Sequence, residues 1–406
     1  MNRPPNLPWF SGMRVPLLDL SEQYSSLAEP IRQRLDEVLA SQRFILGPNV
    51  TKFEGAIAKF TGAGHAIGVS SGTDALLVVL MAMGIGPGDA VLTTPYSFFA
   101  TAGCVARVGA RPLFVDIDPA TYHISPARLT DFLQNQCERR DGQTIHRATG
   151  QILRAIVPVH LFGLCCDMNA IDGIAREHGL AVIEDAAQAI GAEILFQSRV
   201  TQAGTMGLYG CFSFYPSKNL GAAGDAGLVT CQDEALAARI RAFREHGMEP
   251  RYYHHLIGGN FRIDEIQAAI LDVKLPHLSG WSAARRAAAD FYREEFTRAG
   301  LTGAVELPAE PYRGQVPSHH IYHQYVIRTS RRDALRDHLQ KKSVGTAIYY
   351  PVGLHEQECF SYLGYGRGDL PETERAAAQT LALPIFPEIT RAAQTYVVDS
   401  IAEFLR

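Results

Sequence analysis

Two short stretches carry a lysine and an acid that can serve one reaction. In residues 210–221, GCFSFYPSKNLG, an apolar strand ends in a turn that presents Lys218. In residues 181–192, AVIEDAAQAIGA, a short apolar strand ends in Asp185. A lysine at a strand end is by default a surface residue, but together with this acid it suits a pyridoxal phosphate site. That cofactor needs an amine for its aldehyde and a carboxylate that keeps its pyridine nitrogen protonated.

The order of the motifs resembles that of a known enzyme family. EDAAQ, FSFYPSKNLG and GGNFRIDEIQAAIL follow one another as in nucleotide-sugar aminotransferases of the DegT or StrS type, which are fold-type I pyridoxal phosphate enzymes. The similarity runs from Val15 to Glu388. It implies an α/β fold with a mostly parallel, doubly wound sheet in a large domain and a smaller C-terminal α/β domain. Alternating strand and helix patterns up to about Leu278 favour the same sheet.

The resemblance implies how the phosphate of the cofactor would be held. A strand through Val69 leads to a turn and then to a helix that Thr73 and Asp74 are expected to open. Free N–H groups at a helix N-terminus attract an anion. In the family, the backbone at Gly72 and Thr73 and the hydroxyl of Ser213 bind the phosphate.

Two further side chains are expected at the cofactor ring. In the segment TPYSFFAT, the resemblance places the stacking aromatic at Phe98, although an aromatic at this helix start could equally be a core residue. Gln188 would hydrogen-bond the ring oxygen or back the ring. His160, at the end of the next buried strand, is more often structural at such a position, although the family has this VHLFG motif near the cofactor.

The segment GGNFRIDEIQAAIL resembles the part of the family that crosses into the active site of a second subunit. Asn260 would then reach the neighbour's phosphate and Arg262 an acidic group of the substrate, since a guanidinium suits both carboxylate and diphosphate. Without the family, the two residues would be read as a turn asparagine and a helix-start arginine. The crossing predicts a homodimer with shared active sites.

Tyrosines and histidines near the C-terminus resemble the elements that line the family's sugar pocket. They are His320 and His323 in residues 319–328 and Tyr349, Tyr350 and His355 in IYYPVGLH; of these, His320, Tyr350 and His355 are predicted to bind substrate.

The predicted reaction moves an amino group from glutamate to a ketone of a sugar linked to a nucleoside diphosphate. Lys218 would take up and return the proton, and Asp185 would stabilise the charge on the ring. IGGNFRIDEIQ and the preceding YYHH resemble members that act on 3-keto sugars, such as a thymidine diphosphate 6-deoxyhexose. A 4-keto sugar or a keto-inositol is the alternative.

Three other classes of protein fit the sequence less well. Sugar dehydratases of the family carry histidine at the position of Lys218. A regulator built on the fold would be expected to carry a DNA-binding extension, and only residues 1–12 are available for one. A NAD-dependent oxidoreductase would need a glycine loop that opens a helix, whereas a strand follows Gly227.

Composition argues for a cytoplasmic globular enzyme without nucleic-acid or membrane partners. The 406 residues carry a formal net charge of -4, so bulk attraction to nucleic acid or to an anionic membrane is not expected. Neither a signal peptide nor an apolar run of membrane-spanning length is apparent. The 7 cysteines show no zinc spacing and are expected to be buried thiols. Asp116 and Asp118 are explained by turn chemistry, and no metal is predicted.

The expected domains are an extension and first segment at residues 1–28, a large cofactor-binding domain at 29–278 and a small domain at 279–406. Either Met1 or Met13 could be the start. A helix is predicted at 30–40, opened by Pro30, and an exposed polar insertion at 137–150. In the small domain, strands are predicted at 319–328 and 344–350, and helices at 281–299, 331–342 and 389–405.

Overall fold

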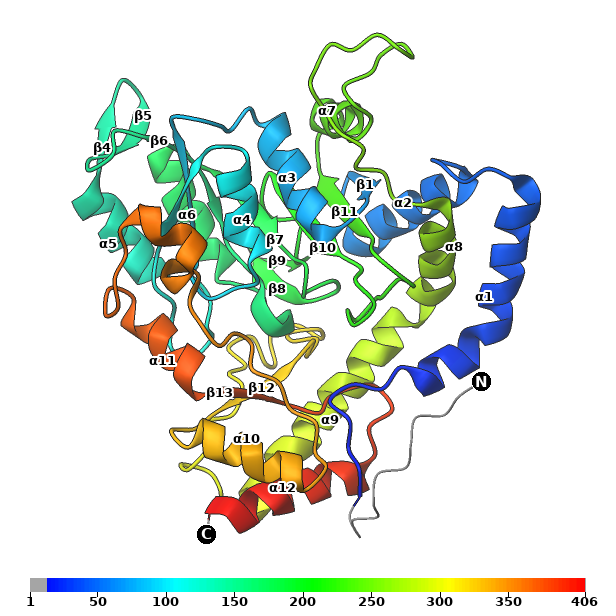
Figure 1. The fold of residues 1–406 in the computed structure, drawn as a ribbon, viewed down its shortest axis with the longest axis vertical. Helices are drawn as coiled ribbons and strands as arrows, with labels where there is room; N and C mark the ends of the chain where they lie inside the picture. The colour runs from blue at the N-terminus through cyan, green and yellow to red at the C-terminus, as the bar shows by residue number, and fades with distance from the viewer. Residues whose placement is uncertain (1–12, 406) are drawn as a thin grey trace.

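The structure, a computed structural model, describes residues 13–405, and the predicted extension over residues 1–12 lies outside that range. Its centre is a nine-stranded sheet (Figure 1). Seven strands lie side by side in the order β1 (His65–Val69), β11 (Gly227–Cys231), β10 (Tyr209–Ser213), β7 (Ala181–Asp185), β6 (Ile152–Val157), β2 (Asp89–Thr93) and β3 (Arg111–Phe114). Pairs from β10 to β3 are parallel, and β11 is antiparallel to both neighbours. This confirms the predicted mostly parallel sheet.

Helices cover both faces of this sheet, which is why its strands are apolar throughout. Every residue of β2 and of β11 is buried, as expected for strands covered on two sides. One core cluster is shared by α2 (Pro48–Thr61), α5 (Pro126–Gln136), α6 (Met168–His178) and α8 (Glu265–Lys274). The other is shared by α3 (Gly72–Ala82), α4 (Ala100–Arg107) and α7 (Glu234–Arg244).

The C-terminal part has its own core below the sheet in Figure 1. The long helix α9 (Leu278–Arg298) leads into it, after the short helix η2 (Leu275–His277). The part contains β12 (Tyr325–Arg328) antiparallel to β13 (Thr380–Leu383), with α10 (Arg332–Lys341), α11 (Pro371–Gln379), α12 (Arg391–Leu405), η3 (Leu354–Glu356) and η4 (Glu358–Leu363).

Two local predictions are wrong. The helix expected to begin at Pro30 is α1 (Ser21–Ser41), and Pro30 lies in its interior. Its start is held by the carboxylate of Asp19, which accepts from the Ser21 N–H at 2.8 Å. The strand expected at residues 344–350 is absent, because this segment makes only isolated bridges, from Val344 to Val15 and from Ala347 to Ala382 beside β13.

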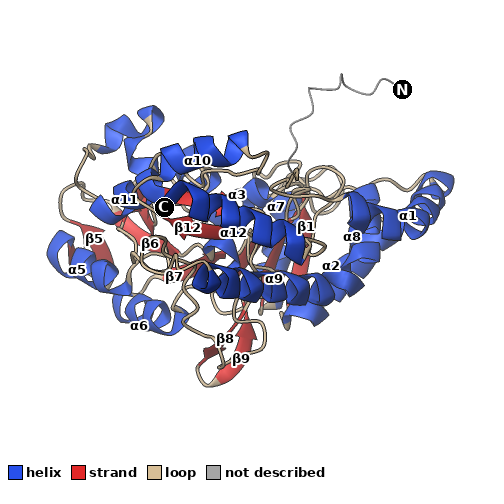
Figure 2. Ribbon diagram, turned by 90° about the horizontal axis from the view of Figure 1, so that it is seen from below, coloured by secondary structure: helices blue, strands red, loops and turns tan. Residues whose placement is uncertain are grey.

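The polar insertion at 137–150 is more ordered than predicted. It folds into a hairpin of β4 (Cys137–Arg140) and β5 (Gln143–His146), and β5 pairs with the start of β6. The side chains of Thr144, Ile145 and His146 are buried as a result. A second hairpin, β8 (Glu193–Phe196) and β9 (Arg199–Gln202), projects from the body of the molecule in Figure 2. Within residues 13–405, no helix has the length and apolar character needed to span a membrane.

Candidate active site

Lys218 and Asp185 follow two neighbouring strands of the sheet. β7 and β10 are parallel, and Cys211 lies opposite Asp185 in their register. The turn after β10 is closed by a hydrogen bond from the Lys218 N–H to the Tyr215 carbonyl at 2.8 Å. Because carboxyl ends of parallel strands meet at one edge of a sheet, the two predicted residues are brought to the same place.

The environment of Lys218 makes its amine easier to deprotonate than that of a lysine in water. Burial lowers its pKa to about 8, against the opposing effect of the negative charge of Asp185. The positive charge of Lys218 in turn contributes to the strongly lowered pKa of buried His323, although desolvation is the main cause. A free amine near neutral pH is the form that can bind a carbonyl carbon.

Asp185 is a buried carboxylate held by two donors. Thr101 Oγ1 donates to its Oδ2 at 2.8 Å, and the Ala187 N–H donates to its Oδ1 at 3.2 Å. Burial raises the pKa of Asp185, while these hydrogen bonds and the charge of Lys218 act against the rise. The carboxylate is 5% exposed, so a nearby cation such as a protonated pyridine nitrogen would compensate part of its desolvation. Sequence reasoning missed Thr101, because nothing in TPYSFFAT indicates that it faces β7.

The residue before Asp185 anchors the same strand end from the other side. Glu184 is fully buried and accepts hydrogen bonds from the N–H groups of Gly204, Met206 and Gly207. His160 lies 2.8 Å from it through Nε2, and its Nδ1 accepts from the Cys166 N–H. His160 is therefore a structural histidine that fixes the strand end rather than a group open to a ligand.

The start of α3 lies against the hydroxyl side chain predicted to share the phosphate. A Cβ atom on Gly72 would lie 2.7 Å from Cβ of Ser213, so only glycine permits this approach. The helix begins at Gly72 and is capped by Ser71, whose side chain accepts from the Asp74 N–H. The prediction that Thr73 and Asp74 open the helix is therefore wrong by one residue, because the helix begins at Gly72. The first N–H groups of α3 and the Ser213 hydroxyl suit a phosphate.

A large aromatic face lies open at the site. Phe98 is 59% exposed, and its ring centroid is 6.4 Å from that of Tyr350. Gln188 links two distant segments here: its Oε1 accepts from the Phe162 N–H at 2.7 Å, and its Nε2 donates to the Tyr350 hydroxyl at 3.2 Å. The exposed face of Phe98 is available for contact with a flat pyridine ring. The residues present thus fit pyridoxal phosphate.

The residues predicted to reach a second subunit lie at the edge of the sheet. Arg262 forms a bridge with Val69 of the edge strand β1, and the Ser70 N–H donates to the carbonyl of Phe261. Asn260 and Arg262 line a cavity of about 380 Å³ together with Ser70, Asp225, Asp264, Gln267 and Ile45. Within residues 13–405, no hydrogen bond joins either side chain to Lys218 or Asp185.

Two predicted substrate residues are buried. His320 is 2% exposed, its ring stacks on Tyr322 at 3.8 Å, and its Nδ1 accepts from the Tyr322 N–H. His355 is also 2% exposed and lies 3.4 Å from the Glu374 carboxylate. Burial lowers the pKa of His320 to about 3. In this arrangement both histidines can influence a substrate only through the residues that they hold, whereas Tyr350 is half-buried.

Comparison with known proteins identifies the family. The DegT/DnrJ/EryC1/StrS aminotransferase pattern matches residues 25–402. The chain belongs to this family. It is thus a pyridoxal phosphate-dependent aminotransferase, which confirms the predicted enzyme class and cofactor.

Relatives of this aminotransferase cover nearly all of it. A "Pleiotropic regulatory protein" of Geobacillus stearothermophilus is 47% identical over 97% of this chain and 99% of its own. A UDP-N-acetyl-3-dehydro-alpha-D-glucosamine 3-aminotransferase of Acidithiobacillus ferrooxidans is 40% identical over 92% of this chain and 94% of its own. The crystal structure of a DegT DnrJ EryC1 StrS aminotransferase from Brucella abortus superimposes with a TM-score of 0.87, at 35% identity over 96% and 98% of the two chains.

Proposed function

We propose that this aminotransferase moves an amino group from glutamate to the C3 ketone of a sugar linked to a nucleoside diphosphate, in the synthesis of amino sugars. The observation that carries the proposal is the pairing of Lys218, with its lowered pKa, and the buried carboxylate of Asp185 at neighbouring strand ends. The Acidithiobacillus relative is named for a 3-aminotransferase. Relatives from Streptomyces venezuelae and Pseudomonas aeruginosa, 37% and 36% identical, are named for a 3-amino and a 3-oxo sugar nucleotide.

The residues have distinct roles in this proposal. Bound pyridoxal phosphate supplies the electron sink for the carbon that loses its proton. Lys218 Nζ would hold the cofactor and, as a free amine, would accept that proton and return it. Asp185 would keep the pyridine nitrogen protonated, and Gln188 and Phe98 would contact the ring.

The phosphate is assigned to the backbone N–H groups of Gly72 and Thr73 and to the Ser213 hydroxyl. Asn260 from a second subunit completes it. On the substrate, Arg262 binds an acidic group and Tyr350 the sugar. His320 and His355 contribute by positioning, since both are buried.

A panel of substrates tests the reaction. With glutamate, the visible band of the cofactor near ~410 to 430 nm should be replaced by one near ~330 nm, and Lys218→Ala should abolish the first band. Nucleotide sugars with the ketone at C3 should then restore the visible band faster than 4-keto sugars. Faster restoration by a 4-keto sugar or a keto-inositol would select the alternative substrate. Failure of the first step would contradict the aminotransferase reaction itself.

The proposal includes a homodimer with shared active sites. Lys218→Ala and Arg262→Gln are each expected to be inactive as homodimers. When the two variants are mixed, unfolded and refolded together, a hybrid dimer contains one site with both native residues, so activity should return. Mixtures that stay inactive would show that each site is built from one chain. Wild type mixed with each variant controls for refolding yield.

A regulator is the second candidate, because the Geobacillus relative carries that name. The spectral experiment separates the two functions, since a protein that only senses a ligand need not release an amino group.

We also propose that the chain acts in the cytoplasm, where glutamate and nucleotide sugars are available. Its two domains are proposed to divide near residue 278, where α9 begins.

A further inference from the structure

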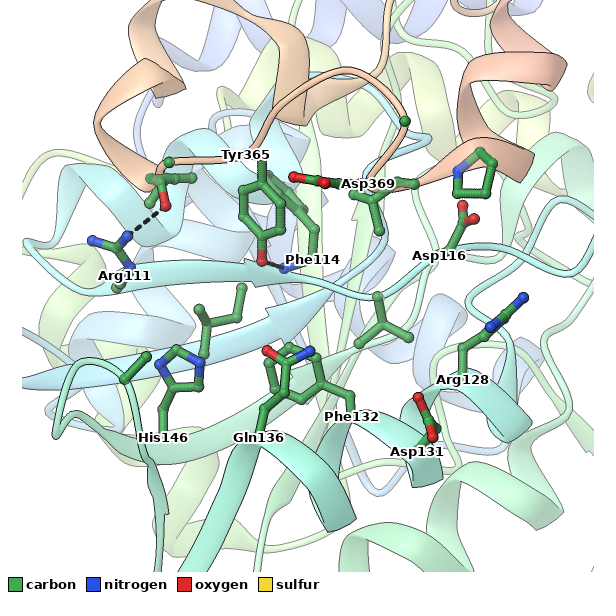
Figure 3. Close-up of a pocket in the computed structure, with 18 residues that line it drawn as sticks. Arg111, Phe114, Asp116, Arg128, Asp131, Phe132, Gln136, His146, Tyr365 and Asp369 are labelled. Carbon is green, nitrogen blue, oxygen red and sulfur yellow. Dashed lines mark hydrogen bonds between the residues drawn. The ribbon is translucent and has the colours of Figure 1, made fainter.

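A second cavity of about 630 Å³ lies at the far edge of the sheet, against β3 (Figure 3). None of the residues predicted to bind cofactor or substrate lines it. Its walls come from three segments: β3 with α5, the inserted β4–β5 hairpin, and residues 363–371 of the C-terminal part. Its volume lies in the range of roughly 300–1,000 Å³ that is typical of small-molecule sites.

One end of the cavity has an arginine without a carboxylate. Arg111 donates from Nη2 to the Leu363 carbonyl at 2.7 Å, and its Nε is buried without a partner. No ion pair involves Arg111 within residues 13–405. Arg111 is half-buried and its guanidinium lies over the Tyr362 ring, 5.9 Å from the centroid, so an anion bound here would complete the hydrogen bonding of its Nε.

His146 and Gln136 lie on the same side of the cavity, below Arg111 in Figure 3. The His146 ring stacks on Phe132 at 5.8 Å, and its Nδ1 lies 2.9 Å from the Thr149 hydroxyl, which leaves Nε2 for a ligand. The Gln136 amide can donate as well. Together with Arg111, these groups offer donors from three elements to one anionic group.

The other end of the cavity offers acceptors. Asp131 Oδ1 accepts from Asn135, and Asp369 Oδ2 accepts from the Gly366 N–H, so each carboxylate keeps one oxygen free in the described structure. Arg128 lies beside Asp131 in Figure 3. Carboxylates and arginine side by side suit the hydroxyl groups of a sugar, which both donate and accept.

The third acid in the cavity wall is not available to a ligand. Asp116 accepts from the N–H groups of Ile117, Glu372 and Thr373 and from the Thr373 hydroxyl. These bonds tie the start of α11 to the end of β3. Asp116 is therefore structural, and it holds the cavity in shape.

The cavity does not suit a peptide strand. β3 is the outer strand of the sheet, and a peptide could pair only with N–H groups on its free side. The Phe114 N–H already donates to the Tyr365 hydroxyl at 2.9 Å, and Pro112 on the same side has no N–H. The occupant must therefore be held by side chains.

We propose that this cavity binds a phosphorylated sugar, with the phosphate at Arg111, His146 and Gln136 and the hydroxyls at Asp131, Asp369 and Arg128. Apolar side chains of the floor, including Leu113 and Leu370, contact the ring carbons. A free sugar phosphate and the sugar phosphate part of a nucleotide sugar share this chemistry. The site is independent of the function proposed above.

Calorimetry with the holoenzyme and N-acetylglucosamine 1-phosphate tests the site. Binding should weaken by about 10- to 100-fold in Arg111→Gln and in Arg128→Gln, as expected for charge-assisted hydrogen bonds. Arg107→Gln, an exposed arginine of α4 outside the cavity, is the matched control and should bind as wild type. Both cavity variants should keep wild-type kcat and KM for amino transfer. The side chain of Arg128 makes no hydrogen bond in the described structure, and its backbone N–H, which donates to the Ser125 hydroxyl, is kept in the variant, so Arg128→Gln should fold normally.

Other results would overturn the proposal. Binding that is lost in Arg262→Gln but not in Arg128→Gln would place the probe in the active site. Inorganic phosphate that binds as tightly as the sugar phosphate would leave only an anion site. If the site is real, displacement by UDP-N-acetylglucosamine identifies the ligand as a nucleotide sugar, and lack of displacement identifies it as a free sugar phosphate.

Discussion

Replacement of Thr101 by valine tests how the active-site acid is held. Thr101 Oγ1 donates to Asp185 Oδ2 at 2.8 Å, and it lies 2.9 Å from the Ser97 hydroxyl on its other side. Valine keeps the shape but removes the donor. A hydrogen bond to a buried charged group contributes about 1.5–3 kcal/mol, which corresponds to roughly 10- to 150-fold in an equilibrium constant. Because the bond favours the carboxylate form, its loss should weaken cofactor binding and lower kcat by about that factor.

The pH dependence of stability separates this electrostatic role from packing. Burial raises the pKa of Asp185 above 3.8. An acid with a raised pKa costs stability above its unfolded pKa, because its ionised form is less favourable in the folded protein than in the unfolded chain. Loss of the Thr101 donor should therefore destabilise the cofactor-free protein more at pH 7 than at pH 4, as measured by denaturant unfolding.

Thr101→Ser is the matched control, since it retains the hydroxyl and should behave nearly as wild type. A valine variant with unchanged cofactor affinity would refute the reasoning. So would a loss of stability of equal size at both pH values, because a packing defect does not depend on the charge of Asp185.

Three further predictions follow from the same site. Lys218 is protonated below its pKa of about 8. The rate at which cofactor-free protein takes up pyridoxal phosphate, followed by absorbance, should therefore rise with pH to about 8 and then level off. A rate that continues to rise toward pH 10 would contradict the burial of the Lys218 amine. Gly72→Ala places a Cβ 2.7 Å from Cβ of Ser213, so it should lower the free energy of unfolding by about 1–3 kcal/mol and reduce cofactor affinity. The control is Gly55→Ala, which has open space around it and should stabilise α2 by up to about 1 kcal/mol. Glu184→Gln should lower the free energy of unfolding by about 3–5 kcal/mol, because three N–H groups and His160 depend on one buried carboxylate. The control, Glu177→Gln on the surface, should change it by no more than about 0.5 kcal/mol. Equal unfolding midpoints for the two variants would disprove the structural role of Glu184.

The sequence determined the fold class and the pairing of Lys218 with Asp185, because both depend on local patterns. Apolar runs without alternation indicate strands buried on two faces; Asp185 ends one such run, and Lys218 lies in the turn that follows the other. Parallel strands place their carboxyl ends at one edge, which favours the meeting of amine and acid, and the sheet order of the structure makes the two strands neighbours.

Only the tertiary structure decided the contacts between distant segments. Thr101 reaches Asp185 from α4, and Tyr350 reaches Gln188 from the C-terminal part. Burial of His320 and His355 likewise depends on which surfaces pack together. No periodic pattern within a single segment of the sequence predicts contacts between segments so far apart. The cavity beside β3 is a further case, since its walls come from three separate stretches of the chain. One of them is the polar insertion at residues 137–150, and nothing in its sequence indicates that it pairs with β6.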